Sequence, residues 1–197
     1  FTMPNPKDPK YKEKLDSTCT EMLKKLKEDY HIAFASEITA KDYVDVPPIR
    51  IEVKPNSVPF RATAARSYPV GREAECRDII KKLNTSGVIR RNEKVTSWCA
   101  YGFFVPKSNG GLRLVVDFRK INSSCNRIGI PFDSNKDIFN QIPSAAVAFI
   151  TLDLTSSFFQ LRVAEEDQDY LSFIVPCGKF ALERAAMGEL NSGDNLN

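Results

Sequence analysis

Residues 104–117 read FVPKSNGGLRLVVD and hold the clearest structural signal in the chain. Apolar, β-branched stretches flank Asn109-Gly110, a dipeptide that is typical of a tight turn between antiparallel strands. We therefore predict strands at 101–106 and 112–118, joined as a β-hairpin.

Two cations belong to this hairpin. Lys107 stands at its bend and Arg113 stands just past it. The planar fork of an arginine and the compact charge of a lysine can together clamp one triphosphate. A solvated edge hairpin is the alternative interpretation, because charged edge strands are common.

Helical and extended patterns alternate outward from the hairpin. Apolar residues recur at three- and four-residue steps over 8–30 and over 71–86, and Ser86-Gly87 is typical of a helix end. Further elements are predicted as a helix at 134–142, strands at 49–53, 88–91, 145–154, 170–175 and 179–185, and a polar break at 165–169. Helices and strands mix without strict βαβ alternation, which predicts an α+β fold.

Charge is unevenly spread along the 197 residues, whose net charge is +3. Residues 1–46 sum to −1, residues 47–131 to +10 and residues 132–197 to −6. The basic middle predicts a phosphate-binding surface, with Arg66 and Arg77 and the candidate nucleic-acid contacts Arg72, Lys81, Lys82, Arg90 and Arg91. Solvated helix and loop faces are the alternative for each of these residues.

Several classes of protein are disfavoured. The five cysteines form no C-x-x-C pair and the single histidine, His31, has no cysteine at zinc-ligand spacing, so reduced thiols in an intracellular protein, cytoplasmic or nuclear, are expected. No apolar run reaches the roughly 20 residues that span a bilayer, so no membrane contact is expected. The first residue is Phe1, which indicates a segment of a longer protein.

Asp153 ends an apolar stretch, where a buried carboxylate needs a partner. A divalent cation is one such partner, and a hydrogen-bonded cap at a strand end is the other. Ser156-Ser157 then predicts a tight turn that exposes Phe158.

Seven segments in order resemble the reverse transcriptase of Gypsy-type LTR retrotransposons, a right-hand polymerase related to the retroviral enzymes. The resemblance runs from about Pro48 to the end of the chain. The segments are 86–90, 97–98, 105–113, 116–122, 152–160, 164–167 and 187–188. It implies a helical extension (1–46), a fingers-like module (47–131) and the first part of a palm (132–197).

The resemblance also implies roles for single residues. Asp153 would be a catalytic carboxylate that binds Mg²⁺. Lys107 and Arg113 would hold the phosphates of an incoming nucleotide, and Phe158 would exclude a 2′-hydroxyl and so select deoxynucleotides. Met187 and Gly188 would lie against the sugar and the template. An RNA or DNA template-primer would be the macromolecular partner.

Departures from the family bear on activity. The 197 residues contain no Asp-Asp pair, whereas the family places its other two catalytic carboxylates in a Tyr-x-Asp-Asp hairpin. The chain is therefore expected to be inactive alone, because two Mg²⁺ ions need more carboxylate than Asp153 offers. Glu189 stands where the family has an apolar residue.

Two readings of the whole chain stay open: a fragment of a working polymerase, or a captured retroelement product that binds or supports other molecules without catalysis. An incomplete palm is expected to expose apolar strands at 145–154 and 170–185. A partner chain or self-association over that face is expected in turn.

Overall fold

The computed structural model describes residues 9–31, 39, 43–127, 133–144, 146, 149, 151, 153–154 and 156–189. The chain divides into two compact units, Phe1–Glu37 with Pro131–Thr155, and Ile38–Ile130 with Ser156–Asn197. The division of the sequence into 1–46, 47–131 and 132–197 stays a prediction.

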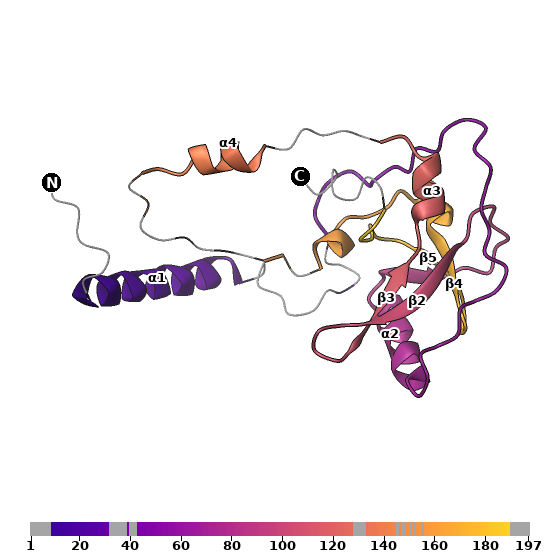
Figure 1. Ribbon diagram of the computed structural model, residues 1–197, viewed down its shortest axis with the longest axis horizontal. Coiled ribbons are helices and arrows are strands. Elements are labelled where there is room, and N and C mark those ends of the chain that lie inside the picture. The colour runs from indigo at the N-terminus through magenta and orange to yellow at the C-terminus, as the bar shows by residue number, and fades with distance from the viewer. Residues whose placement is uncertain are drawn as a thin grey trace. The chain divides into compact units, whose positions relative to one another are not determined.

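A five-stranded sheet organises the larger unit (Figure 1). Its strands are β1 (Ile89–Arg91), β2 (Ala100–Pro106), β3 (Leu112–Val116), β4 (Ser172–Val175) and β5 (Gly178–Leu182). Their spatial order is β1-β5-β4-β2-β3, with β2 and β4 parallel and every other pair antiparallel. The predicted hairpin is confirmed as β2 and β3, in which Val105 lies opposite Arg113.

Helix α2 (Glu73–Thr85) packs against β3 and β1, and it buries Cys76 and Ile80. Glu73 and Glu75 lie in its first turn, where carboxylates favour the positive end of the helix dipole. At its end Gly87 takes a φ of 65°, which lets the Val88 amide donate to the Leu83 carbonyl at 3.0 Å. The predicted stop at Ser86-Gly87 is therefore confirmed, and glycine is favoured there because its φ is left-handed.

Two expected strands are shorter or absent. The strand predicted to reach 118 ends at Val116, and helix α3 (Arg119–Ser124) follows, although the sequence pattern did not indicate it. The predicted strand 49–53 is wrong, because Ile49 and Val53 form only isolated bridges, to Val163 and Cys125.

The polar break at 165–169 is a 3₁₀ helix, η3 (Glu165–Leu171), and two of its acids, Asp167 and Asp169, pair with arginines of the same unit. Asp167 accepts hydrogen bonds from the Arg50 Nε at 2.6 Å and the Ile51 amide at 3.0 Å. Asp169 accepts from the Arg90 guanidinium at 2.9 Å. Basic residues from the middle of the chain thus neutralise acids near its end.

The smaller unit holds α1 (Pro9–Asp29) and α4 (Asn135–Asn140), which lie within the helices predicted at 8–30 and 134–142. Of the strand predicted at 145–154, the structure describes residues 146, 149, 151, 153 and 154, and none of these is in a strand. The other residues of that stretch lie outside the described residues. Within the described part of the chain, no helix has the length and apolar character that crossing a membrane requires.

The expectation that 170–185 exposes an apolar face is wrong for the strands in this range. β4 and β5 are interior strands of the sheet, and Phe173, Val175 and Leu182 are each at most 3% exposed. These side chains pack into the core of the larger unit, and β4 is an interior strand because it pairs with β2, a non-local pairing that sequence patterns do not reveal.

Candidate nucleotide and nucleic-acid groove

A groove of about 750 Å³ lies in the larger unit, beside β3 and α2 and the turn that contains Met187. We call it the hairpin groove. Its cationic lining residues are Arg66, Lys82, Lys107, Arg113 and Arg119, and its other walls are mostly aliphatic and aromatic. A groove with many cations and apolar walls suits a ligand that combines phosphate with a flat, weakly polar ring system.

The hairpin positions the two cations singled out from the sequence. Lys107 donates its amide to the Gly111 carbonyl at 2.7 Å, and the Gly110 amide donates back to the Lys107 carbonyl at 3.0 Å. Arg113 lies in β3 opposite Val105, and the side chains of Lys107 and Arg113 are both exposed. Within the described residues neither side chain has an ion-pair partner, so both charges face the groove unneutralised.

Helix α2 fixes the hairpin against its first turn. Glu75 accepts the Leu112 amide at 2.9 Å, and Arg72 donates to the Gly110 carbonyl at 2.8 Å. Arg72 and Glu75 are also paired with each other at 2.6 Å. The hydrogen bonds of Arg72 and Glu75 therefore hold the hairpin loop, which carries Lys107 and follows β2, against the start of α2.

Met187 and Gly188, which the resemblance assigns to the same nucleotide site, also line the groove. Asn122 of α3 donates to the Gly188 carbonyl at 2.8 Å, which anchors this turn, and Met187 is 70% exposed. Glu189 follows and is buried next to Cys125. Burial, with a smaller contribution from Glu189, raises the pKa of the Cys125 thiol to about 11.

Phe158 does not line the groove, whereas Phe159 does. The predicted tight turn exists, since Ser156 takes a φ of 50° and η2 (Ser157–Gln160) follows. The expected exposure of Phe158 is wrong, because its ring is partly buried against the core. The aromatic pair at 158–159 was visible in the sequence, but the direction of each ring depends on the left-handed Ser156.

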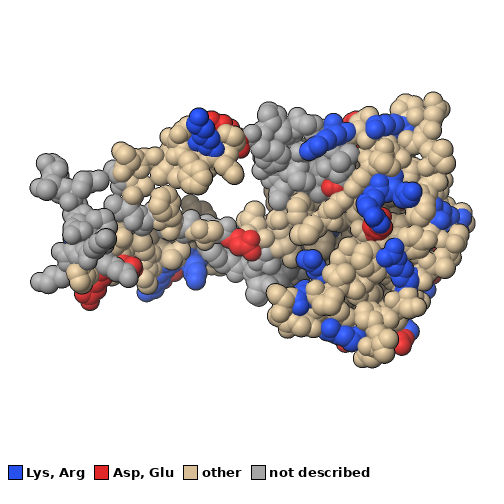
Figure 2. Space-filling view, viewed as in Figure 1, with Lys and Arg blue, Asp and Glu red and all other residues tan. Residues whose placement is uncertain are grey.

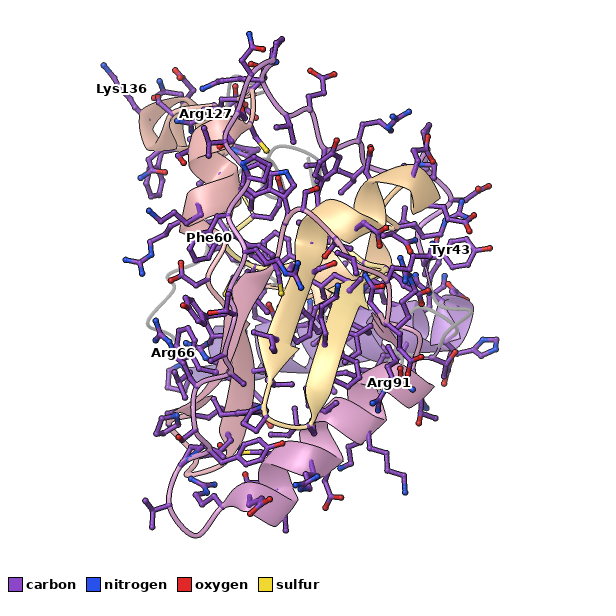
Figure 3. All side chains as sticks on the ribbon, turned by 90° about the vertical axis from the view of Figure 1, so that its right-hand side faces the viewer. Tyr43, Phe60, Arg66, Arg91, Arg127 and Lys136 are labelled. Carbon is purple, nitrogen blue, oxygen red and sulfur yellow. The ribbon has the colours of Figure 1, made fainter. Side chains whose placement is uncertain are left out.

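Aromatic rings and a guanidinium group lie together on the β2–β3 side of the sheet, where Figure 3 labels Phe60 and Arg66. The Arg66 guanidinium lies 4.9 Å from the centre of the Phe103 ring and 5.1 Å from that of Tyr101. Phe60 in turn lies 5.9 Å from Tyr101. Such rings can stack on bases while the cations meet phosphates. The sequence analysis did not assign base stacking to Tyr101 and Phe103. The pattern that could have indicated this role is their spacing of two positions within β2.

One carboxylate lines the groove among its described residues, namely Asp117. Arg119 donates to both of its oxygens, at 2.8 Å and 2.7 Å. These hydrogen bonds hold the pKa of Asp117 below its ordinary value. The carboxylate stays ionised and paired at neutral pH, so it does little to offset the other cations.

The five candidate nucleic-acid contacts are placed differently. Lys82 lines the hairpin groove, and Lys81 is exposed beside it in sequence on α2. Arg72, Arg90 and Arg91 each pair with an acid, respectively Glu75, Asp169 and Glu93. Figure 2 shows more blue than red over the larger unit, so this face is predominantly cationic. Contact of these five with nucleic acid stays a prediction.

Asp153 belongs to the smaller unit and is exposed. No group of three or more histidine, cysteine or acidic side chains suited to a metal ion occurs among the residues that the structure describes. The described donor set therefore does not fit a two-Mg²⁺ centre, which needs several carboxylates within reach of both ions. A catalytic role for Asp153 stays a prediction.

The fold is shared with part of a retroviral polymerase chain. The prototype foamy virus protease-reverse transcriptase gives a TM-score of 0.69 at 18% identity, over 89% of this chain and 23% of that one. The foamy viral protease-reverse transcriptase in complex with an RNA/DNA hybrid gives 0.68 at 18% identity, with the same coverage. The same viral protein has also been solved with double-stranded DNA, and it gives 0.68 over 89% of this chain and 36% of that one.

The amino-acid sequence is similar to parts of retrotransposon polyproteins. The chain is 32% identical over 117 residues to the Transposon Tf2-3 polyprotein of Schizosaccharomyces pombe, and equally to the Tf2-4 polyprotein. The match covers 58% of this chain and 9% of the length of those relatives. No protein-family model matches the chain. The region is thus similar to part of a retrotransposon polyprotein and has the fold of part of a retroviral protease-reverse transcriptase.

Proposed function

We propose that the chain is the fingers and first part of the palm of a Gypsy-type reverse transcriptase, and that it grips nucleotide phosphates and a template-primer. One observation carries this proposal: Lys107, Arg113, Met187 and Gly188, four of five residues assigned to the nucleotide from sequence, line the same groove. They come from two stretches about 75 residues apart in the chain, so their meeting is a property of the fold.

Catalysis by the 197 residues alone is not part of the proposed function. Phosphoryl transfer would need Mg²⁺, and Asp153 is the one residue here that the resemblance assigns to it. We expect purified chain to give no primer extension with an RNA template, deoxynucleotides and Mg²⁺. Extension that Asp153→Asn abolishes would contradict this part of the proposal.

A binding experiment tests the proposed contact with the template-primer. We expect a labelled RNA/DNA hybrid to bind the 197-residue chain, with a Kd that weakens at least about tenfold between low and physiological salt. The double variant Lys107→Gln/Arg113→Gln should weaken binding about tenfold or more and make the salt dependence shallower, because two phosphate contacts are lost. Fluorescence anisotropy across a salt series measures both quantities.

The matched control is Lys54→Gln/Arg127→Gln, which removes the same charge from two exposed positions outside the groove lining. We expect a change of less than about threefold for this pair, since long-range attraction alone is altered. Equal losses of affinity for the hybrid in both double variants would exclude the groove as the binding site and would indicate binding to a diffuse cationic surface.

A further inference from the structure

Two residues outside the lining of the hairpin groove hold the loop that carries its first cation. Arg72 and Glu75 contact the loop between β2 and β3, and we call this ion pair the loop clamp. We propose that the loop clamp positions Lys107 and Arg113 for the phosphates of the template-primer. This role rests on the proposed function, and it differs from the direct nucleic-acid contact that the sequence predicted for Arg72.

The loop needs restraint from outside the sheet. β3 is an edge strand, so the hairpin has a neighbouring strand on the β2 side only. Within the loop, the Lys107 amide donates to the Gly111 carbonyl at 2.7 Å, and the Gly110 amide donates to the Lys107 carbonyl at 3.0 Å. These two hydrogen bonds close the turn but do not attach it to the rest of the unit.

The loop clamp supplies this attachment at two points. Glu75 accepts the amide of Leu112, the first residue of β3, at 2.9 Å. Arg72 donates to the Gly110 carbonyl at 2.8 Å, so the two contacts flank Gly111. The two side chains also bind each other at 2.6 Å. An acceptor and a donor joined in one ion pair fix both the position and the direction of the loop.

The restraint reaches the groove cations along the chain. Arg113 directly follows Leu112, whose amide Glu75 holds, and Lys107 begins the same loop. A loop that is ordered before binding loses less conformational entropy when its side chains grip a ligand. The loop clamp therefore raises affinity for phosphate without touching the ligand.

Electrostatic attraction alone predicts the opposite effect of removing Glu75. A carboxylate repels a polyanion, so Glu75→Ala should tighten binding of nucleic acid if the acid acts only through its charge. If Glu75 positions the hairpin, the same substitution weakens binding. The sign of the change thus separates a positioning role from a charge effect.

The first measurement is the Kd of the 197-residue chain for a labelled RNA/DNA hybrid at low salt, by fluorescence anisotropy. We expect Glu75→Ala to weaken binding about fivefold. Glu75→Gln keeps an acceptor for the Leu112 amide but loses the ion pair, so it should weaken binding about twofold.

The matched control is Glu73→Ala. Glu73 lies in the same first turn of α2, and it pairs with Arg77 of the same helix at 2.7 Å. The control therefore removes the same charge from the same helix end, and its affinity should be unchanged or slightly higher. Hydrogen exchange of peptides that cover 107–113 should be faster in Glu75→Ala than in Glu73→Ala, because only Glu75 holds the loop.

A double-mutant cycle shows whether the loop clamp acts through the groove cations. In the Lys107→Gln/Arg113→Gln background, Glu75→Ala should cause less than about twofold further loss, because no groove cation remains to be positioned. Arg72→Gln should likewise add less than about twofold in that background. A direct nucleic-acid contact of Arg72 would instead keep its full effect there.

Two results would overturn the proposal: hybrid binding by Glu75→Ala that is as tight as that of the unmodified chain, or a full further loss from either clamp substitution in the double-variant background. Both results would leave the groove as the binding site. Failure of the proposed function has a different signature. If Lys107→Gln/Arg113→Gln binds no worse than Lys54→Gln/Arg127→Gln, the groove is excluded as the binding site, and the positioning role is excluded with it.

Discussion

Asp167 and Glu166 are neighbouring acids that contact the same arginine, yet their surroundings differ. The Asp167 side chain is 8% exposed and accepts from both the Arg50 side chain and the Ile51 amide. The Glu166 side chain is 62% exposed, and it meets Arg50 at 3.1 Å. A buried acceptor of two donors is expected to matter far more than a solvated ion pair.

We therefore predict that Asp167→Asn lowers the free energy of unfolding by about 2–3 kcal/mol, because it leaves a buried amide and a guanidinium poorly matched. Glu166→Gln should cost less than about 1 kcal/mol. Urea denaturation followed by circular dichroism measures both. Similar losses for the two variants would show that the Arg50 contact, and not burial, carries the stabilisation.

Residue types alone could not separate these two acids. The run at 165–169 has five polar residues in a row, and the pattern indicated only a break. Which of them is buried depends on η3 and on the segment at 49–51. Ile49 forms a bridge to Val163, and this pairing brings Arg50 and Ile51 within hydrogen-bonding distance of Asp167. The same limit applies to Arg90 and Arg72, which look like phosphate ligands in sequence and pair with acids in the structure.

Elements built from local signals were predictable, and those built from distant pairing were not. The β2–β3 hairpin follows from Asn109-Gly110, and the end of α2 follows from Gly87, because each depends on a few adjacent residues. The parallel pairing of β2 with β4 joins Ala100 to Phe173, and no short pattern encodes it. The hairpin groove could be predicted in part: Lys107 and Arg113 are local to one hairpin and Met187 and Gly188 came from the family resemblance, whereas Phe159 reaches the groove through tertiary packing.

Gly102 is where the β2–β4 pairing constrains the sequence most closely. A Cβ atom at this position would lie 2.7 Å from the Val175 Cγ1 and 2.9 Å from the Phe173 Cδ2. Both neighbours belong to β4 and are buried, so they have little room to move. The glycine is therefore required by close approach of two strands.

Gly102→Ala should lower the free energy of unfolding by about 1–3 kcal/mol, the usual cost of an overpacked core. Gly111→Ala is the control in the same hairpin, since its Cβ would meet only the Asn109 Oδ1, at 3.4 Å. Thermal unfolding of both variants checks the difference. If the Gly102→Ala variant proves as stable as the unmodified chain, β4 is not held against β2 at this point.

At the scale of the whole molecule, the two units differ in how much they bury. The larger unit has a continuous core of strand and helix residues, including Cys76, Leu171 and Phe173, each with no measurable exposure. In the smaller unit, α1 has no buried residue among those described, although Leu15, Cys19, Leu23 and Leu26 form a half-buried stripe along it. Stability should therefore be unevenly distributed along the chain.

Hydrogen exchange followed by mass spectrometry should show this difference directly. A helix of 21 residues with little tertiary cover is marginal in water, so peptides from 9–29 should exchange within seconds. Peptides from β2, β4 and β5 should be protected by several orders of magnitude, since their amides are released only by global unfolding.

The measurement also addresses self-association, which the sequence predicted over the strands at 170–185, although the structure shows that these strands are buried. Protection of 9–29 that rises with protein concentration would mean that a second copy covers the stripe on α1. Protection of 9–29 that matches the sheet at every concentration would contradict the division into a cooperative core and a weakly held helix.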